Sequence, residues 1–240
     1  MRIFGNSHSD YYGHGMAEFP ALQRGFYYVV ATIVGIWNHI FWPWSIEGRE
    51  RLFPAAGERG LIIVMNHCSM IEPCVTDVTF LWSGHRIRPV YKSEFDGVSI
   101  MGWFLSVVGG ISISRGTADL KALRDCQHAL ERGESVLIYP EGTRVFNDQQ
   151  PVEVHGGFAV MARMAKADVV PVAVVGCQRA DGRGGTRRPG RIYLKVGERI
   201  SLDDVEGETR KKKLVNLERV AMERVYELRD ELRAEHPGKL

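Results

Sequence analysis

The 240-residue chain is 45% hydrophobic and 25% charged, and its 31 basic and 29 acidic residues leave a formal charge of +2. These proportions are typical of a globular protein and exclude a disordered or collagen-like chain. A mean hydropathy of −0.16, with charges along nearly the whole chain, excludes several membrane spans. The small net charge does not indicate a nucleic-acid-binding protein, so we expect no nucleic-acid partner.

The cysteines and the N-terminus indicate the compartment. The cysteines, Cys68, Cys74, Cys126 and Cys177, form no Cys-x-x-Cys pair and no Cys/His group with zinc spacing, so the sequence predicts no zinc site. The first 15 residues lack a basic start followed by an apolar core and do not resemble a secretory signal. Thiols without such a signal are typical of a reducing cytoplasm.

An apolar segment runs from Phe26 to Ile46, without acidic or basic residues besides His39. Its uninterrupted part, Phe26–Trp37, has 12 residues, whereas a spanning helix needs about 20. Rings that prefer a membrane interface lie at its two ends: Tyr27 and Tyr28, then Trp37, Trp42 and Trp44. We expect residues 1–48 to form a tail and a membrane-docking helix or helical hairpin that enters one leaflet. The alternative is a buried core helix.

After Gly48, short apolar runs alternate with helical patterns. Strands are expected at 61–65, 88–91, 110–114, 135–139, 169–175 and 191–196, and helices from Glu72 and at 119–131, 156–167 and 208–235. This alternation predicts that residues 49–240 form one α/β domain with a largely parallel sheet flanked by helices. The last helix has one apolar stripe and needs no functional explanation.

A histidine and a carboxylate follow the first buried strand. His67 comes directly after the strand and Asn66, and the carboxyl ends of parallel strands are where ligands bind. Histidine is suited to accept a proton near neutral pH. Pro73 favours a helix start, which would let the Glu72 side chain turn back and orient the imidazole. Asp77, one turn further along that helix, is the alternative partner.

Three further blocks have unusual composition. Gly109–Arg115 places an arginine behind glycines at a strand end, and Tyr139–Arg144 places a glutamate and an arginine at another. Pro171 lies within an apolar strand, although it lacks the N–H that a central strand needs. We therefore expect it at a sheet edge, at a strand start or at a bulge.

These blocks resemble the glycerolipid acyltransferases typified by the 1-acyl-glycerol-3-phosphate acyltransferases. That family carries Asn-His followed by four residues and Asp, then Gly…Arg, Pro-Glu-Gly-Thr-Arg and Val-Pro-Val. This chain carries, in the same order, NHCSMIE, GGISISR, YPEGTR and VVPVAV, with YKSEF and HGGF between them. The resemblance covers residues 61–196 and implies the glycerol-3-phosphate acyltransferase-like fold, to which the apolar N-terminal segment would add membrane docking.

The resemblance implies a role for each matching residue. His67 would be the general base that deprotonates the acceptor hydroxyl, and Glu72 stands where the family has Asp. The substrate-binding residues would be Arg115, Glu141, Gly142, Thr143, Arg144, Lys92 and Pro171. Lys92 is equally well explained as a solvated loop charge. No metal or cofactor is implied, because acyl-CoA or acyl-carrier protein enters as the acyl-donor substrate.

The expected function is transfer of a fatty acyl chain to a lysophospholipid hydroxyl, above all that of 1-acyl-glycerol-3-phosphate, giving phosphatidic acid. The alternatives are the same chemistry on glycerol-3-phosphate, a lyso-ornithine lipid or a glycolipid, and a non-catalytic lipid-binding membrane protein. We expect a monotopic or peripheral protein on the cytoplasmic face of the inner membrane. Arginines between Arg179 and Arg191, and the basic run 210–213, are either solvated surface or a site for lipid headgroups or coenzyme A phosphates. The sequence makes no prediction of the oligomeric state.

Overall fold

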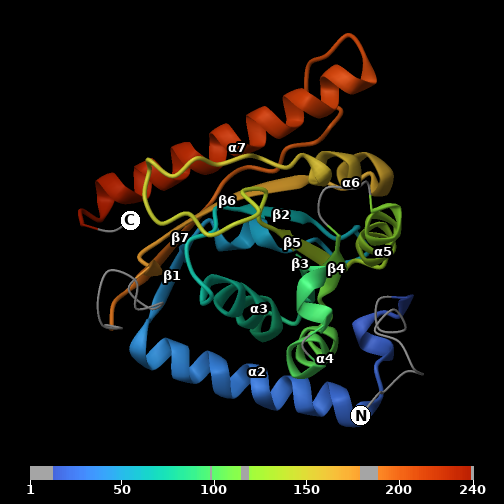
Figure 1. Ribbon diagram of the computed structural model, residues 1–240, viewed down its shortest axis with the longest axis vertical. Helices are drawn as coiled ribbons and strands as arrows, with labels where there is room; N and C mark the ends of the chain where they lie inside the picture. The colour runs from blue at the N-terminus through green and yellow to red at the C-terminus, as the bar shows by residue number, and fades with distance from the viewer. Residues whose placement is uncertain (1–12, 98, 115–118, 179–188, 239–240) are drawn as a thin grey trace.

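A computed structural model describes residues 13–97, 99–114, 119–178 and 189–238, which fold around one seven-stranded sheet (Figure 1). The strand order is β1-β7-β6-β2-β5-β3-β4. The strands are β1 (Trp44–Glu47), β2 (Ile62–Met65), β3 (Ile87–Lys92), β4 (Ile111–Ile113), β5 (Ser135–Ile138), β6 (Val169–Val175) and β7 (Ile192–Val196). All pairs are parallel except β6 with β7, so the predicted α/β fold with a largely parallel sheet is confirmed.

Helices cover both faces of the sheet (Figure 1). They are α2 (Ala21–Phe41), α3 (Glu72–Trp82), α4 (Ser99–Val107), α5 (Leu120–Glu131), α6 (Gly157–Ala165) and α7 (Arg210–Glu235), with short 3₁₀ turns at Met16–Glu18, Arg49–Leu52 and Ser93–Gly97. Alternate residues of a strand point to opposite faces. Ile62 and Val64 of β2 accordingly pack with α5, α6 and α7, whereas Ile63 and Met65 pack with α3. The runs at β2, β5 and β6 are apolar throughout because both of their faces are covered.

The N-terminal apolar segment differs from the expectation in two ways. Its helical part is one continuous helix, α2, so a hairpin is wrong for these residues. Its end, Trp44–Glu47, is strand β1, which pairs in parallel with β7 and therefore belongs to the sheet. The local sequence of Trp44–Glu47 gives no sign of a strand, because the strand with which it pairs, β7, is far away in the sequence. Within the described part of the chain, no helix combines the length and the hydrophobicity that crossing a membrane requires.

Helix α2 lies along α3, on the side of the molecule away from α7 (Figure 1). Its buried residues are Tyr27, Ala31, Gly35 and Asn38, at the spacing of one helix face. The aromatic side chains that were expected at a membrane interface are partly buried and partly exposed. Trp42 and Trp44 pack against the core and Tyr27 is buried, whereas Tyr28 and Trp37 are exposed.

Pro171 lies on β6, an interior strand, and not at an edge or a strand start. Its carbonyl accepts a hydrogen bond from the Gly197 amide, so its nitrogen also faces β7. The register slips at this point, because Val172 pairs with Val196 while Val169 pairs with Ile200. The extra residue lies just after β7, between Val196 and Ile200, so Pro171 faces a bulge of the neighbouring chain segment. The N–H that proline lacks coincides with this interruption of the ladder.

Candidate active site

The site lies at the carboxyl ends of four neighbouring parallel strands, which together form one end of the sheet. In the order β2, β5, β3 and β4, these strands are about 4.8 Å apart. His67 follows β2, Glu141 follows β5, and Lys92 is the last residue of β3. The parallel direction of the strands thus gathers the sequence blocks at the same edge. Arg115, two residues after β4, lies outside the described residues, as do Arg179, Arg183, Arg187 and Arg188.

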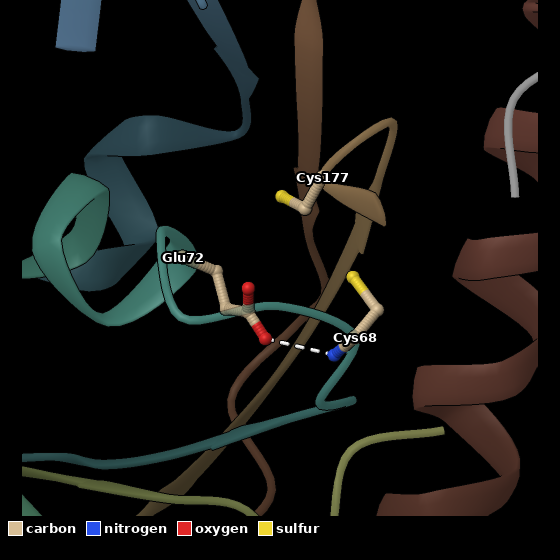
Figure 2. A group of neighbouring side chains, drawn as sticks. All are labelled: Cys68, Glu72 and Cys177. Atoms are coloured by element: carbon tan, nitrogen blue, oxygen red, sulfur yellow. Dashed lines mark hydrogen bonds between the residues drawn. The ribbon is translucent and has the colours of Figure 1, made fainter. Parts of the chain in front are cut away.

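His67 and Glu72 are in direct contact. The His67 Nδ1 atom lies 2.6 Å from Glu72 Oε1, and the same oxygen accepts a hydrogen bond of 2.9 Å from the backbone amide of Ser69. It also accepts one of 2.8 Å from the backbone amide of Cys68 (Figure 2). Glu72 is the first residue of α3, ahead of Pro73, so its side chain turns back over the loop, and it is fully buried. Three donors on one oxygen fix the carboxylate, and the carboxylate fixes the imidazole.

Asp77, the alternative partner, takes no part in the hydrogen bonds that connect His67 and Glu72. Its Oδ1 accepts a hydrogen bond of 2.9 Å from the hydroxyl of Tyr27, on α2. Burial raises the pKa of Asp77 to about 7, against the opposing effect of the Tyr27 hydroxyl. The structure therefore places Asp77 at the junction of α2 and α3, and places Glu72 beside His67.

The backbone around His67 is held from several directions. Its amide donates to Glu141 Oε2 (2.6 Å), its carbonyl accepts from the Val145 amide (2.7 Å), and its ring stacks on Tyr139 with centroids 4.2 Å apart. Asn66 joins the loop to β6, because its side-chain amide pairs with both the N–H and the carbonyl of Val174. With Nδ1–H donating to Glu72, the lone pair on Nε2 is left to accept a proton.

Glu141 is buried, and both of its carboxylate oxygens are used within the protein. Oε2 accepts from the His67 amide, and Oε1 accepts from the hydroxyl of Tyr226 on α7 (3.2 Å). Burial raises the pKa of Glu141, while these two hydrogen bonds oppose the rise. In this geometry Glu141 holds the histidine loop and anchors α7.

The residues after Glu141 form a tight turn. Gly142 has φ +58°, a conformation that favours glycine, and its amide donates to the Tyr139 carbonyl. Thr143 is exposed, and Arg144 is half-buried with its guanidinium carbon 5.9 Å from the centre of the Phe146 ring. The turn thus presents Thr143 and Arg144 beyond the edge of the sheet.

A small pocket beside His67 includes residues that the sequence did not single out. It is lined by Asn66, His67, Cys68 and Glu141, by residues 145–148 and Gln178, and by Arg229 and Arg233 of α7. Arg233 also makes two hydrogen bonds of 3.1 Å to Asp148. Tyr226, Arg229 and Arg233 recur at helical spacing, which is the signal that could have marked a functional face. Their position over the site depends on the fold.

Two of the predicted substrate-binding residues belong to strands of the sheet. Pro171 is buried opposite Val64, inside β6. Lys92 is half-buried and opposite Ile113, next to the end of β4. As for metal ligands, the described residues bring together Cys68, Glu72 and Cys177, whose ligand atoms all lie within 4.8 Å of one another (Figure 2).

Comparisons with known proteins show the family of the chain. The family model described as "Acyltransferase" matches residues 45–175, more than half of the chain. A 1-acyl-sn-glycerol-3-phosphate acyltransferase of Chlamydomonas reinhardtii is 31% identical over 163 residues, which are 65% of this chain and 46% of that protein. The enzyme of the same name from Bacillus subtilis is 26% identical, over 78% of this chain and 89% of that protein.

Two other matches concern the acceptor and the fold. A lyso-ornithine lipid O-acyltransferase of Pseudomonas aeruginosa is 29% identical over 140 residues, 58% of this chain and 51% of that protein. The crystal structure of the 1-acyl-sn-glycerophosphate (LPA) acyltransferase PlsC from Thermotoga maritima has the same fold, with a TM-score of 0.64 and 23% identity, covering 88% of this chain and 79% of that chain. This chain spans less than half the length of the algal and plant relatives it matches. The family-model match, which includes strands β2 to β6 and the loops between them, shows that the chain belongs to the acyltransferase family.

Proposed function

We propose that the protein transfers a fatty acyl chain from acyl-CoA or acyl-carrier protein to the hydroxyl of a lysophospholipid, with 1-acyl-glycerol-3-phosphate as the first candidate acceptor. The observation that carries this proposal is the 2.6 Å contact between His67 and the buried Glu72 at the carboxyl edge of the sheet. A histidine oriented by a carboxylate is the usual arrangement for a general base. The names of the relatives support acyl transfer to a glycerolipid.

In this mechanism His67 Nε2 takes the proton of the acceptor hydroxyl while the oxygen attacks the thioester carbonyl. The C–O bond forms, the C–S bond breaks, and the leaving thiolate takes the proton back from the imidazolium. Glu72 stabilises the imidazolium in between, and its own position is fixed by the amides of Cys68 and Ser69. No protein nucleophile is acylated, so the buried thiol of Cys68 has no part in the transfer.

The acceptor site would lie beyond the turn that carries Thr143 and Arg144. An arginine is suited to phosphate because its planar guanidinium binds two oxygens at once. Lys92, the last residue of β3, would extend the same cationic site; by its resemblance to the family, we propose a role in acceptor binding for Arg115 as well. Arg144 is described and half-buried, which makes it the residue of choice for a test.

We further propose that α2 docks on the cytoplasmic face of the membrane. One face of α2 carries apolar side chains that are each exposed by 42% or more: Leu22, Phe26, Val29, Ile33, Ile36, Trp37 and Ile40. An apolar stripe of this kind is typical of a helix that lies in the membrane interface. The end of α2 also contacts Gly190, because the Phe41 carbonyl accepts a hydrogen bond from the Gly190 amide.

The catalytic role is tested by His67→Ala, with His128→Ala on the exposed side of α5 as the matched control. We expect His67→Ala to lose turnover by about 100-fold or more, as removal of a general base does. The control should keep it, and both variants should melt as the unmodified protein does. Release of thiol from acyl-CoA with mass-spectrometric identification of the product measures turnover. Near-normal turnover of His67→Ala would refute the mechanism, and lipid binding without acyl consumption in the unmodified protein would favour a non-catalytic role.

Membrane docking is tested by Ile33→Glu in α2, with Val215→Glu as the control, because Val215 is similarly exposed (53% against 61%) but lies on α7. Removing one apolar side chain from the interface should weaken binding to vesicles of anionic phospholipids about tenfold or more. Cosedimentation measures this binding. Equal binding by the two variants would show that α2 is not the docking helix.

A second acceptor is favoured by the likeness to the lyso-ornithine lipid O-acyltransferase. An ornithine headgroup carries an ammonium and a carboxylate group and no phosphate, so a phosphate contact of the arginine next to the turn exists for only one of the two acceptors. Arg144→Gln should raise KM for 1-acyl-glycerol-3-phosphate about tenfold and leave KM for an acceptor without phosphate unchanged. A screen of both acceptors, with glycerol-3-phosphate and a glycolipid, decides between them.

A further inference from the structure

Two cysteine side chains meet directly behind the His67–Glu72 pair. Cys68 follows His67 in the loop after β2, and Cys177 follows β6, the strand next to β2 in the sheet. Cys68 is 2% exposed and Cys177 is fully buried. The sulfur atoms and a carboxylate oxygen of Glu72 all lie within 4.8 Å of one another (Figure 2).

The carboxylate of Glu72 is used on one side only. Oε1 accepts three hydrogen bonds, whereas Oε2 is buried and has no hydrogen-bond partner. Figure 2 shows that this second oxygen is turned to the side on which the two sulfur atoms lie. A buried carboxylate oxygen without a donor is uncommon, and a bound water, a ligand or an ion would satisfy it.

Two sulfurs and a carboxylate oxygen are the donor set of a thiophilic divalent cation. Zn²⁺ binds thiolate sulfur at about 2.3 Å and carboxylate oxygen at about 2.0–2.2 Å, in tetrahedral geometry. Ligand atoms around such an ion are less than 4.8 Å apart, so the three groups need little movement to close on it. We propose that Cys68, Cys177 and Glu72 form a site for Zn²⁺ or Cd²⁺, with water as the fourth ligand, and that the bound ion inhibits the enzyme.

The inhibition follows from the shared carboxylate, and it rests on the proposed function. An ion on Oε2 withdraws negative charge from Oε1, which is the oxygen that supports the imidazolium of His67. The ion also places positive charge close to a base that becomes positive during the reaction. His67 therefore becomes a weaker base, and the rate of the chemical step falls while substrate binding is little changed.

Binding is coupled to proton release. Zn²⁺ and Cd²⁺ bind cysteine as the thiolate, so each thiol has to give up its proton to the solvent when the ion binds. Metal binding replaces two S–H bonds by two metal–sulfur bonds and releases two protons. The affinity should therefore rise with pH, as it does for thiolate sites in general.

The binding test uses Cd²⁺ and the purified full chain. We expect one Cd²⁺ per chain, a thiolate-to-cadmium charge-transfer band of two-thiolate intensity, and a higher melting temperature. Cys177→Ala and Cys177→Ser should lose the band and the rise in melting temperature. Cys126→Ala is the matched control, because Cys126 is equally buried but lies on α5, and it should keep both. Absence of the band in the unmodified protein, or full retention in the Cys177 variants, would overturn the proposal.

The activity test separates this proposal from the proposed function. Cd²⁺ at concentrations that saturate the band should lower kcat about tenfold or more in the unmodified protein and in Cys126→Ala, with KM changed little and full recovery on adding a chelator. Each Cys177 variant should be insensitive relative to its own metal-free rate. Equal inhibition of the Cys177 variants would refute the link to Glu72. Absence of turnover in every metal-free sample would instead refute the proposed function, while the spectroscopic result would stand.

Discussion

At the scale of single residues, Glu72 supplies the negative charge beside His67. Its Oε1 accepts from the imidazole and from two backbone amides, all within 2.9 Å. The two amides would hold a neutral acceptor as well, but only a carboxylate stabilises the imidazolium. The charge and the position of this side chain can therefore be tested separately.

Glu72→Gln should keep the fold and lower kcat by about 100-fold or more, because the amide accepts hydrogen bonds but carries no charge. Glu72→Asp should keep turnover within about tenfold, because the charge remains and the loop has to move by one methylene. Steady-state kinetics with thiol detection measures both variants. If Glu72→Gln and Glu72→Asp lost activity equally, geometry and not charge would explain the role of Glu72.

Asp77 connects pH to stability. Burial raises its pKa to about 7, from an ordinary value of 3.8, so the folded protein holds a proton that the unfolded chain has released. Its contribution to the free energy of unfolding is therefore fully present below about pH 4 and is lost as pH rises through 7. Because Asp77 is partly accessible to solvent, this loss should be about 2 kcal/mol and not the full value of the shift.

Asp77→Asn should keep the Tyr27 hydrogen bond and remove this dependence. We expect the melting temperature of the unmodified protein to fall from pH 5 to pH 8, and that of Asp77→Asn to fall less. Asp204→Asn is the control, because Asp204 is exposed, and it should behave as the unmodified protein does. Parallel curves for all three proteins would show that Asp77 is charged throughout this range.

At the scale of elements, the close packing of α2 on α3 depends on a glycine. A Cβ atom added at Gly35 would lie 2.6 Å from the Val78 side chain and 2.9 Å from Trp82, whereas one at Gly25 would meet nothing within 4 Å. Gly25→Ala should raise the free energy of unfolding by about 0.5–1 kcal/mol, since alanine favours the helix. Gly35→Ala should lower it by about 1–3 kcal/mol through overpacking. Denaturant midpoints measure both, and equal shifts would show that α2 is not held against α3.

The sequence predicted those elements whose pattern is local. The strands at β2, β5 and β6 stand out because they are covered on both faces, and α5 and α7 because they carry one apolar stripe each. β1 was missed because Trp44–Glu47 continues an apolar helical segment and becomes a strand only by pairing with β7. α4 was not assigned either, because its nine residues show no clear polar face.

The same distinction applies to the site. His67 and Glu72 are five residues apart, so their contact could be predicted from the loop and the helix start between them. The meeting of Cys68 with Cys177 could not, because it depends on β2 and β6 being neighbours in the sheet. Zinc-spacing rules detect ligands that are close in sequence and therefore do not detect this pair.

At the scale of the whole molecule, the candidate active site combines the loops after β2 and β5 with the last helix, α7. Tyr226 of α7 donates to Glu141, which in turn accepts from the amide of His67. Arg229 and Arg233 follow on the same face and line the pocket beside His67. A helix for which the sequence indicated one apolar stripe and no function thus brings two cations to the candidate active site.

These two cations should bind the anionic part of a substrate. Arg229→Gln and Arg233→Gln should each raise KM for a phosphate-bearing substrate about tenfold, because a hydrogen bond between charged groups is lost. The kcat value should change little, since neither residue contacts the His67–Glu72 pair in the bonds described above. Arg219→Gln is the matched control, because Arg219 lies on the same helix, is 57% exposed and pairs with Glu223. Initial rates over a range of acyl-donor and acceptor concentrations show which substrate is affected, and a KM unchanged in both variants would mean that α7 supports the site through Tyr226 alone.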